Sequence, residues 1–415
     1  MSAADCALAA AFDPRHLADS FYDDPFATYR ALREHEPVKR MADGSVFLTR
    51  YADIAAVYKD TATFSSDKRE EFAPKYGATP LFEHHTTSLV FNDPPMHTRV
   101  RRLIAGALTP RHIAAMQVRV VERVDALLDA MAERAPGAEV DLIESFASAI
   151  PIEVIGNLLG VPTGERGPLR DWSLAILGAL EPVPSAAQHA AGNAAVTGFL
   201  RYLVGLVARR HAEPGDPNTD VLTRLIEGEA GGEKLSAPEL LHNCIFLLNA
   251  GHETTTNLIG NGLRCLLEAP AEKARLIAEP ERIASAVEEF LRIESSNQLG
   301  NRITTCATAI GGVALASRTQ VTLAIGAANR DPAQFADPDR LDIARTPNRH
   351  LAFGSGIHQC VGMGLARLEG RVAIGRFLQR FPGYRLAAAP VRARRARFRG
   401  HVWLPVLLGP SNEIE

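Results

Sequence analysis

The stretch HLAFGSGIHQCVGMGLAR (residues 350–367) places Cys360 between a glycine-rich turn and a regular apolar pattern. Glycines on both sides of the cysteine allow tight or left-handed backbone and let a flat partner approach closely. From Val361 to about Phe381 apolar residues recur at helical spacing. Cys360 is therefore predicted to open a helix, where free N–H groups and the positive dipole end favour a thiolate, and we interpret it as a metal ligand. The alternative is a helix-opening cysteine that packs as a small hydrophobe.

The pattern F-x-x-G-x-H-x-C-x-G, from Phe353 to Gly362, resembles the haem-binding signature of the cytochrome P-450 family of haem-thiolate monooxygenases. The resemblance implies that Cys360 binds the iron of a b-type haem and that Phe353, His358 and Gly362 contact the haem, His358 at a propionate. It also implies a mainly α fold with small β sheets, a triangular helical prism around the buried haem. We expect residues 1–415 to form one such domain.

Composition narrows the class of protein. The 415 residues are 46% apolar and 22% charged with a net charge of −3, which suits a soluble globular protein with a large core and does not indicate a nucleic-acid binder. Five cysteines without C-x-x-C spacing indicate a reducing compartment and neither a disulfide framework nor a zinc or iron–sulfur site. We find no signal peptide and no stretch approaching the roughly 20 apolar residues of a membrane span. The expectation is a cytoplasmic monomer that does not contact membrane.

The first ninety residues predict a small mixed region. Helices are expected at 25–35 and 52–58, with a strand pair at 38–41 and 45–49. Residues 61–90 show no clear period and are interpreted as a long lid or binding loop.

Amphipathic helices separated by proline and glycine breakers follow. They are predicted at 113–133, 141–160, 167–180, 188–211 and 219–227. Strands are predicted at 303–308, 313–315 and 319–323, and residues 399–406 resemble the family's final hairpin, whose tip touches substrate.

His97 and Arg101 follow a pair of prolines that predicts a helix start, and they lie four residues apart on one helix face. Two cationic or hydrogen-bonding groups on one face suit carboxylates. The pair resembles the H-x-x-x-R element that holds a haem propionate in the family, and Arg302 resembles the second propionate ligand. The alternative for the pair is a solvated basic face.

Ser236 and Glu239 form a capping-box pattern that predicts a helix running to Pro270, roughly 50 Å long. Its middle, Asn249 to Asn257, replaces the expected apolar residues with polar ones, which often marks a functional site. His252 and Glu253 do not begin a zinc-protease motif, H-E-x-x-H, because the fifth position is Thr256 and not a histidine.

This segment resembles the oxygen-activation segment of the family's central helix. On that resemblance Ala250 lies beside the haem and Gly251 leaves room for dioxygen. Glu253 and Thr254 form the acid–alcohol pair that relays protons. The alternative is a polar kink in a buried helix.

Glu289 and Arg292 form an E-x-x-R pair on one helix face. On its own, such a pair is most often a solvent-exposed ion pair that contributes little to stability. Its position between the polar helix and the cysteine turn resembles the family's buried E-x-x-R, and Arg345 is then expected as the third member.

The resemblance implies insertion of one oxygen atom from dioxygen into a hydrophobic small molecule. Electrons are expected from a separate ferredoxin or flavodoxin with its reductase, because the chain shows no nucleotide-binding or cysteine-cluster motif. A peroxide-driven peroxygenase, a haem-thiolate sensor and a helical binding protein without haem remain alternatives. The expected substrate pocket comprises Leu89, Val90, Leu247, Ala250, Leu299, His401 and Val402.

Overall fold

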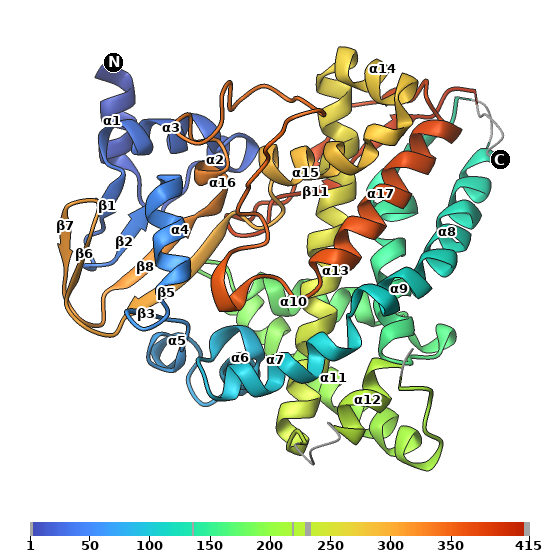
Figure 1. Ribbon diagram of the computed structural model, residues 1–415, viewed down its shortest axis with the longest axis horizontal. Helices are drawn as coiled ribbons and strands as arrows, with labels where there is room; N and C mark the ends of the chain where they lie inside the picture. Colours follow the sequence, from blue (N-terminus) through green and yellow to red (C-terminus); the bar gives the residue numbers. More distant parts are fainter. Residues whose placement is uncertain (1–2, 135–136, 218–219, 229–233, 411–415) are drawn as a thin grey trace.

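One 32-residue helix, α13 (Ala237–Glu268), runs through the middle of the helical part of the molecule, with α17 (Met363–Arg380) beside it (Figure 1). The computed structural model describes residues 3–134, 137–217, 220–228 and 234–410. Helix α13 packs against the helices α6 (Pro80–Thr87), α9 (Ala149–Leu158), α10 (Leu169–Gly178), α11 (Ala186–Ala212), α15 (Ile283–Ile293) and α17. It is therefore the element around which the other helices are arranged.

The other helices lie around this centre. They are α1 (Ala3–Ala11), α2 (Asp19–Asp23), α3 (Phe26–His35), α4 (Tyr51–Lys59), α5 (Arg69–Tyr76), α7 (Met96–Ala107), α8 (Pro110–Ala132), α12 (Val221–Glu227), α14 (Pro270–Ala278) and α16 (Ile325–Ala328). Short helical turns occur at η1 (Leu89–Phe91), η2 (Ile143–Ala147), η3 (Thr163–Glu165), η4 (Pro280–Arg282) and η5 (Gly356–His358).

A five-stranded sheet lies to one side of the helices, on the left in Figure 1. Its order is β1 (Val38–Arg40), β2 (Val46–Leu48), β8 (Gln320–Ala324), β5 (Leu299–Thr304) and β3 (Phe64–Ser65). Only the β2–β8 pair is parallel. Smaller sheets pair β6 (Thr308–Ile310) with β7 (Val313–Leu315), β10 (Val391–Arg392) with β11 (His401–Trp403), and β12 (Pro405–Leu407) with both β4 (Glu139–Asp141) and β9 (Arg385–Leu386). The mainly α fold with small sheets is confirmed.

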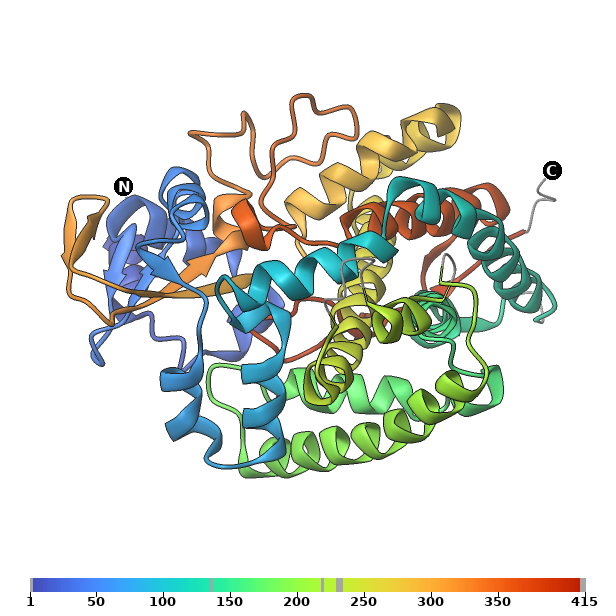
Figure 2. The same ribbon diagram turned by 60° about the horizontal axis from the view of Figure 1, so that its bottom comes forward.

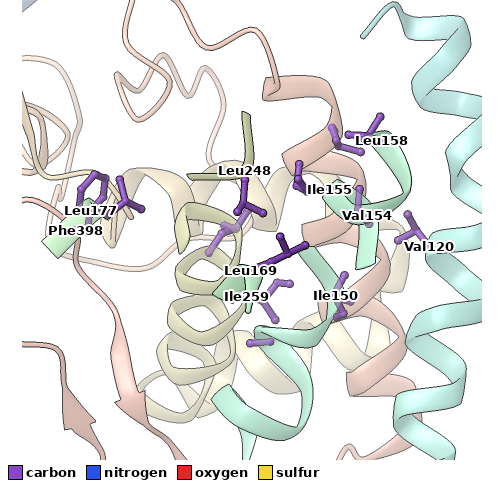
Figure 3. Packing of buried hydrophobic residues seen from close by; sticks show 14 of the residues in the cluster. Val120, Ile150, Val154, Ile155, Leu158, Leu169, Leu177, Leu248, Ile259 and Phe398 are labelled. Carbon is purple, nitrogen blue, oxygen red and sulfur yellow. The ribbon is translucent and has the colours of Figure 1, made fainter. Parts of the chain in front are cut away.

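The predicted start of α13 is confirmed in atomic detail. Ser236 Oγ accepts a hydrogen bond from the Glu239 amide at 3.4 Å, and Glu239 Oε2 accepts one from the Ser236 amide at 2.8 Å. The helix ends at Glu268, because Pro270 cannot continue it. Its apolar residues join a large core that also holds residues of α8, α9 and α10, and Figure 3 shows Leu248 and Ile259 of α13 beside Ile155 and Leu169.

Two predictions, the loop at residues 61–90 and the single helix at residues 141–160, were wrong. Residues 61–90 are not one irregular loop, since they form β3, α5, α6 and the turn η1. The helices α5 and α6 have eight residues each; α5 buries only Phe72 and Tyr76, and α6 buries the polar side chains of His84 and His85 beside Leu81. The predicted helix at 141–160 is likewise divided into the end of β4, the turn η2 and α9.

The predicted final hairpin at 399–406 was also wrong. Strands β11 and β12 both occur there, but β11 pairs with β10 and β12 pairs with β4 and β9. The turn that reaches inward is therefore the loop between β10 and β11, which contains residues 393–400.

Helix α11 is an exception to the prediction that no segment could span a membrane. Among the described residues it is the one helix long and apolar enough to do so, by length and composition only. In the fold it lies along α10 and also contacts α13 (Figure 2). Such a helix is weak evidence for a membrane span, because packed helices of soluble proteins pass the same test.

Candidate functional site

The turn before Cys360 is held by backbone geometry that only glycine accommodates. Gly354 and Gly356 have φ values of 65° and 70°, in the left-handed region. A Cβ atom on Gly356 would lie 2.2 Å from the carbonyl oxygen of Tyr58 in α4. The Cys360 amide then donates to the Phe353 carbonyl at 2.9 Å. The glycine pattern thus seats the cysteine turn against α4.

Helix α17 begins at Met363, two residues after the predicted start at Val361, so Cys360 lies just before the helix and does not open it as predicted. Burial raises the pKa of the Cys360 thiol, and the Gly362 amide, Arg101 and Arg367 act in the opposite direction. These three groups, rather than the helix dipole alone, favour the thiolate. Phe353 lies beside them, with the Arg367 guanidinium 4.7 Å from its ring centroid.

Several buried nitrogen atoms converge near this turn without hydrogen-bond partners. The rings of His97 in α7 and His358 in η5 lie 4.0 Å apart between centroids. Both ring nitrogens of His97, Nε2 of His358 and Nε of Arg302 in β5 have no partner among the described residues. Buried polar atoms are seldom left unpaired. The set therefore fits acidic groups supplied by a ligand, such as two carboxylates.

Burial lowers the pKa of His97 to about 4, and the nearby Arg101 lowers it further. Burial also lowers the pKa of Arg101, while the Cys360 thiolate raises it. Arg101 therefore lies within electrostatic reach of both the imidazole and the sulfur. The structure brings together the residues that the sequence pattern proposed for the haem propionates and the thiolate, from three separate segments: α7, β5 and the cysteine turn.

One face of α13 is open at the middle of the helix. Ala250 is exposed, and Leu247, Gly251 and Thr254 are half-buried, although 20 residues of the helix are buried. Thr254 Oγ1 donates to the Ala250 carbonyl at 2.6 Å. Hydroxyls that bond back to the preceding turn loosen or bend a helix. An open stripe on a central helix is the surface that a large bound group would cover.

Gly251 has a packing role that the sequence did not indicate. A Cβ atom there would lie 2.5 Å from Cδ1 of Ile155 in α9. The missing side chain thus allows α9 and α13 to approach closely, and Figure 3 shows Ile155 pointing to the core near Leu248. The structure gives no direct support for the expectation that Gly251 makes room for dioxygen.

Glu253 is a buried carboxylate with one oxygen engaged and one free. Its Oε1 accepts a hydrogen bond from Arg395 Nη1 at 2.5 Å, whereas Oε2 has no partner among the described residues. Burial raises the pKa of Glu253 to about 7, although Arg395 lowers it. A group with such a pKa can both donate and accept a proton near neutral pH.

Sequence reasoning missed Arg395. It lies in the loop between β10 and β11 and also donates to the Leu174 carbonyl in α10 at 3.1 Å. The run RARRARFR (residues 392–399) was the available signal, since so many arginines in one short segment need partners.

Glu289 and Arg292 form a fully buried ion pair with contacts of 2.7 and 2.8 Å. Arg345 Nε lies 3.2 Å from both Glu289 oxygens, so the expected third member is in place. Arg292 also donates to the carbonyls of Asn329, Pro338 and Arg340. This network ties α15 to the long segment that precedes the cysteine turn.

Three of the expected pocket residues lie elsewhere. His401 is buried in β11, where burial lowers its pKa to about 3, and is not at a loop tip. Val402 is 56% exposed. Leu299 packs into a separate apolar cluster with Phe12 and Phe47. The cause is the strand pairing, since β11 pairs with β10, and β5, which begins at Leu299, pairs with β8.

The remaining pocket candidates fit better. Leu89 is buried, with its amide bonded to Asn243 of α13 at 3.0 Å, and Val90 is half-buried beside it. Leu247 and Ala250 belong to the open face of α13.

Comparisons with known proteins agree with this geometry. The Cytochrome P450 family model matches residues 180–383. Cytochrome P450 107B1 of Saccharopolyspora erythraea is 39% identical over 90% of this chain and 91% of its own. Vitamin D(3) 25-hydroxylase of Pseudonocardia autotrophica is 38% identical over 95% and 96%. The structure of P450BioI in complex with an acyl carrier protein carrying hexadec-9Z-enoic acid superposes with a TM-score of 0.88 at 35% identity, covering 94% of this chain and 100% of that one.

The chain belongs to the cytochrome P450 family. It is a monooxygenase of the bacterial type, an oxidoreductase whose relatives are named as hydroxylases of small molecules. Members of this family are haem-thiolate proteins.

Proposed function

We propose that the chain binds b-type haem through the Cys360 thiolate and hydroxylates a hydrophobic small molecule with dioxygen. The observation that carries the proposal is the convergence of unpartnered buried nitrogens on His97, Arg302 and His358 beside the cysteine turn. With Arg101 they would hold the haem propionates, because ionised carboxylates form strong hydrogen bonds with such donors. Phe353 and Gly362 would flank the haem on the cysteine side, and Ala250 on the opposite side.

The bound haem supplies the chemistry that splits dioxygen, which places one oxygen atom in the substrate and reduces the other to water. The residues of the chain move the protons. Thr254 lies on the open face of α13, and the preceding residue, Glu253, has a carboxyl oxygen without a partner among the described residues. Because Glu253 exchanges protons near neutral pH, it can reprotonate the threonine hydroxyl from the protein side.

The substrate pocket is proposed to lie over this open face, with Leu89, Val90 and Leu247 among its walls. Electrons would come from a ferredoxin or flavodoxin with its reductase, acting on a cytoplasmic monomer. Arg101 and Arg367 both lower the pKa of the Cys360 thiol, so positive charge is present near the cysteine turn.

The test is reconstitution of the holoenzyme. We expect a carbon-monoxide difference band of the thiolate type, and product from a hydrophobic panel substrate only with dioxygen, NADPH, ferredoxin and reductase together. Equal rates with hydrogen peroxide alone would assign the chain as a peroxygenase. A band without product under any reductant would assign it as a sensor.

A further inference from the structure

We propose that the substrate is a carboxylic acid with an apolar body, and that Lys75 of α5 and Arg397 of the β10–β11 loop bind its carboxylate. The inference rests on the proposed function, because it names the substrate class of the same pocket. It is drawn from two partly buried cations whose side chains contact neutral groups and no carboxylate in the described part of the chain.

Lys75 is held in place only by neutral groups. Its Nζ donates to the carbonyl oxygen of Glu181 at 2.7 Å and lies 5.2 Å from the ring centroid of Tyr76. No carboxylate lies within 4.0 Å of it among the described residues. Burial and the positive charge of Arg397 lower the pKa of Lys75 to about 8, although the carboxylates of Glu71 and Glu181 act in the opposite direction. The two cations are therefore close enough to repel each other.

Arg397 shows the same shortage of anions. Its guanidinium donates to the Leu299 carbonyl at 2.9 Å and to the Asn301 side chain, both of which are neutral. Its buried Nε has no partner in the described part of the chain. A partly buried charge with no carboxylate in contact costs free energy. A carboxylate of a bound ligand would therefore be stabilised by pairing with it.

The carboxylates in this region are already engaged. Glu71 Oε2 accepts from Lys68 Nζ at 2.6 Å. Glu181 Oε2 accepts from the Ala396 amide at 2.8 Å, so it holds the backbone of the loop and not the Arg397 guanidinium. Three cations, Lys68, Lys75 and Arg397, thus face two carboxylates, Glu71 and Glu181, so the local charge stays positive.

The cations lie next to the proposed reaction site. Arg397 is two residues from Arg395, which contacts Glu253, so their Cα atoms are at most about 7 Å apart. The charges of Lys75 and Arg397 also lower the pKa of His85, whose buried Nε2 has no partner among the described residues. His85 lies on α6, which packs against α13. A substrate anchored at these cations would thus extend its apolar part along α13.

The geometry also favours a carboxylate over a neutral polar group. Arginine can bind a carboxylate through parallel hydrogen bonds, and hydrogen bonds between charged groups are roughly twice as strong as neutral ones. An ester or alcohol of the same shape would leave both cations unneutralised.

The experiment measures the Soret shift of the holoenzyme with straight-chain alkanoic acids and with their methyl esters as probes. In the natural protein we expect at least one acid to bind about tenfold more tightly than its ester, equivalent to about 1.4 kcal/mol. Lys75→Met and Arg397→Gln should each remove most of that preference and leave ester binding unchanged. Lys75→Arg should retain it, which separates charge recognition from a folding defect. Arg385→Gln, on an exposed residue of β9, is the matched control.

The inference is overturned if no acid in the series binds more tightly than its ester, or if the Lys75 and Arg397 variants keep the preference. Tightest binding by a carrier-linked acyl thioester, with no preference for the free acid, also overturns it. The carbon-monoxide band of each variant separates this failure from failure of the proposed function: a normal thiolate-type band means that only the substrate class was wrong.

Discussion

Arg395 Nη1 lies 2.5 Å from Glu253 Oε1, so the C-terminal β10–β11 loop holds the buried acid of the central helix. The contact joins two segments that are far apart in the sequence. Because Arg395 also bonds the Leu174 carbonyl in α10, it links the loop, α10 and α13 at one point. The behaviour of Glu253 should therefore depend on a residue outside its own helix.

The pH profile tests this contact. Glu253 is protonated below about 7 and ionised above it, because burial raises its pKa despite Arg395, with Glu181 adding to the rise. We expect kcat to fall as pH rises through about 7, since the donor form is lost. Arg395→Gln removes the cation that lowers the pKa of Glu253. The pH at which kcat falls should therefore rise by about one unit or more.

Two further variants control that experiment. Glu253→Gln should abolish this fall of kcat with pH, because the titrating group is gone. Arg394→Gln changes the neighbouring exposed arginine, which pairs with Asp19 at the surface, and should leave the profile where it was. If kcat falls at the same pH in Arg395→Gln as in the natural protein, Glu253 does not control the pH dependence of kcat.

The thiolate assignment is tested by Cys360→Ser. A serine oxygen cannot supply the thiolate, so the thiolate-type carbon-monoxide band should disappear even if haem is retained. Cys265→Ser, which changes a buried cysteine of α13, is the control and should keep the band. An unchanged spectrum in Cys360→Ser would remove the basis of the assignment.

The propionate cradle is tested by His97→Ala. The substitution removes two ring nitrogens that otherwise have no partner in the described structure, so it should weaken haem retention and change the protein without haem little. Haem transfer to apomyoglobin measures retention, and we expect a rate increase of about tenfold, equivalent to roughly 1.4 kcal/mol. His112→Ala, on α8, is the control. Equal transfer rates for His97→Ala and the natural protein would contradict the assignment.

The buried Glu289–Arg292 pair should matter for stability. Arg292→Met leaves the Glu289 carboxylate with only Arg345, Asn348 and the Asp342 amide as partners, and we expect a loss of about 3–5 kcal/mol in the free energy of unfolding. Glu268→Gln breaks the exposed Arg264–Glu268 pair and should cost less than about 1 kcal/mol. Similar losses in both variants, measured by denaturant unfolding, would mean that burial does not distinguish the two pairs.

Glu369 in α17 should make stability depend on pH. Burial raises its pKa from 4.5 to about 8, so the folded protein binds the proton more strongly than the unfolded chain does. Stability from this group is therefore lost as pH rises from 4.5 to about 8. Glu369→Gln should remove that loss of stability, which is on the order of 5 kcal/mol. Glu122→Gln, on the exposed face of α8, should not.

Local patterns were sufficient for much of the fold. The capping box at Ser236 and Pro270 beyond the end predicted α13, because caps and breakers act through neighbouring backbone. Helices α3 and α4 and the β1–β2 pair were predicted for the same reason. Helices α5 and α6 were missed, because each has only eight residues, α5 contains Pro74 and α6 buries polar histidines, so neither shows a clear apolar period.

The sequence by itself determined the cysteine turn and the polar middle of α13, because short-range backbone and side-chain chemistry specifies both. Only the tertiary structure decided which residues complete them. It placed Arg395 on Glu253, placed Leu299, His401 and Val402 in paired strands, and left Lys75 and Arg397 without a carboxylate in contact. Strand pairing and the meeting of distant loops set these contacts, and neither is encoded in the spacing of neighbouring residues.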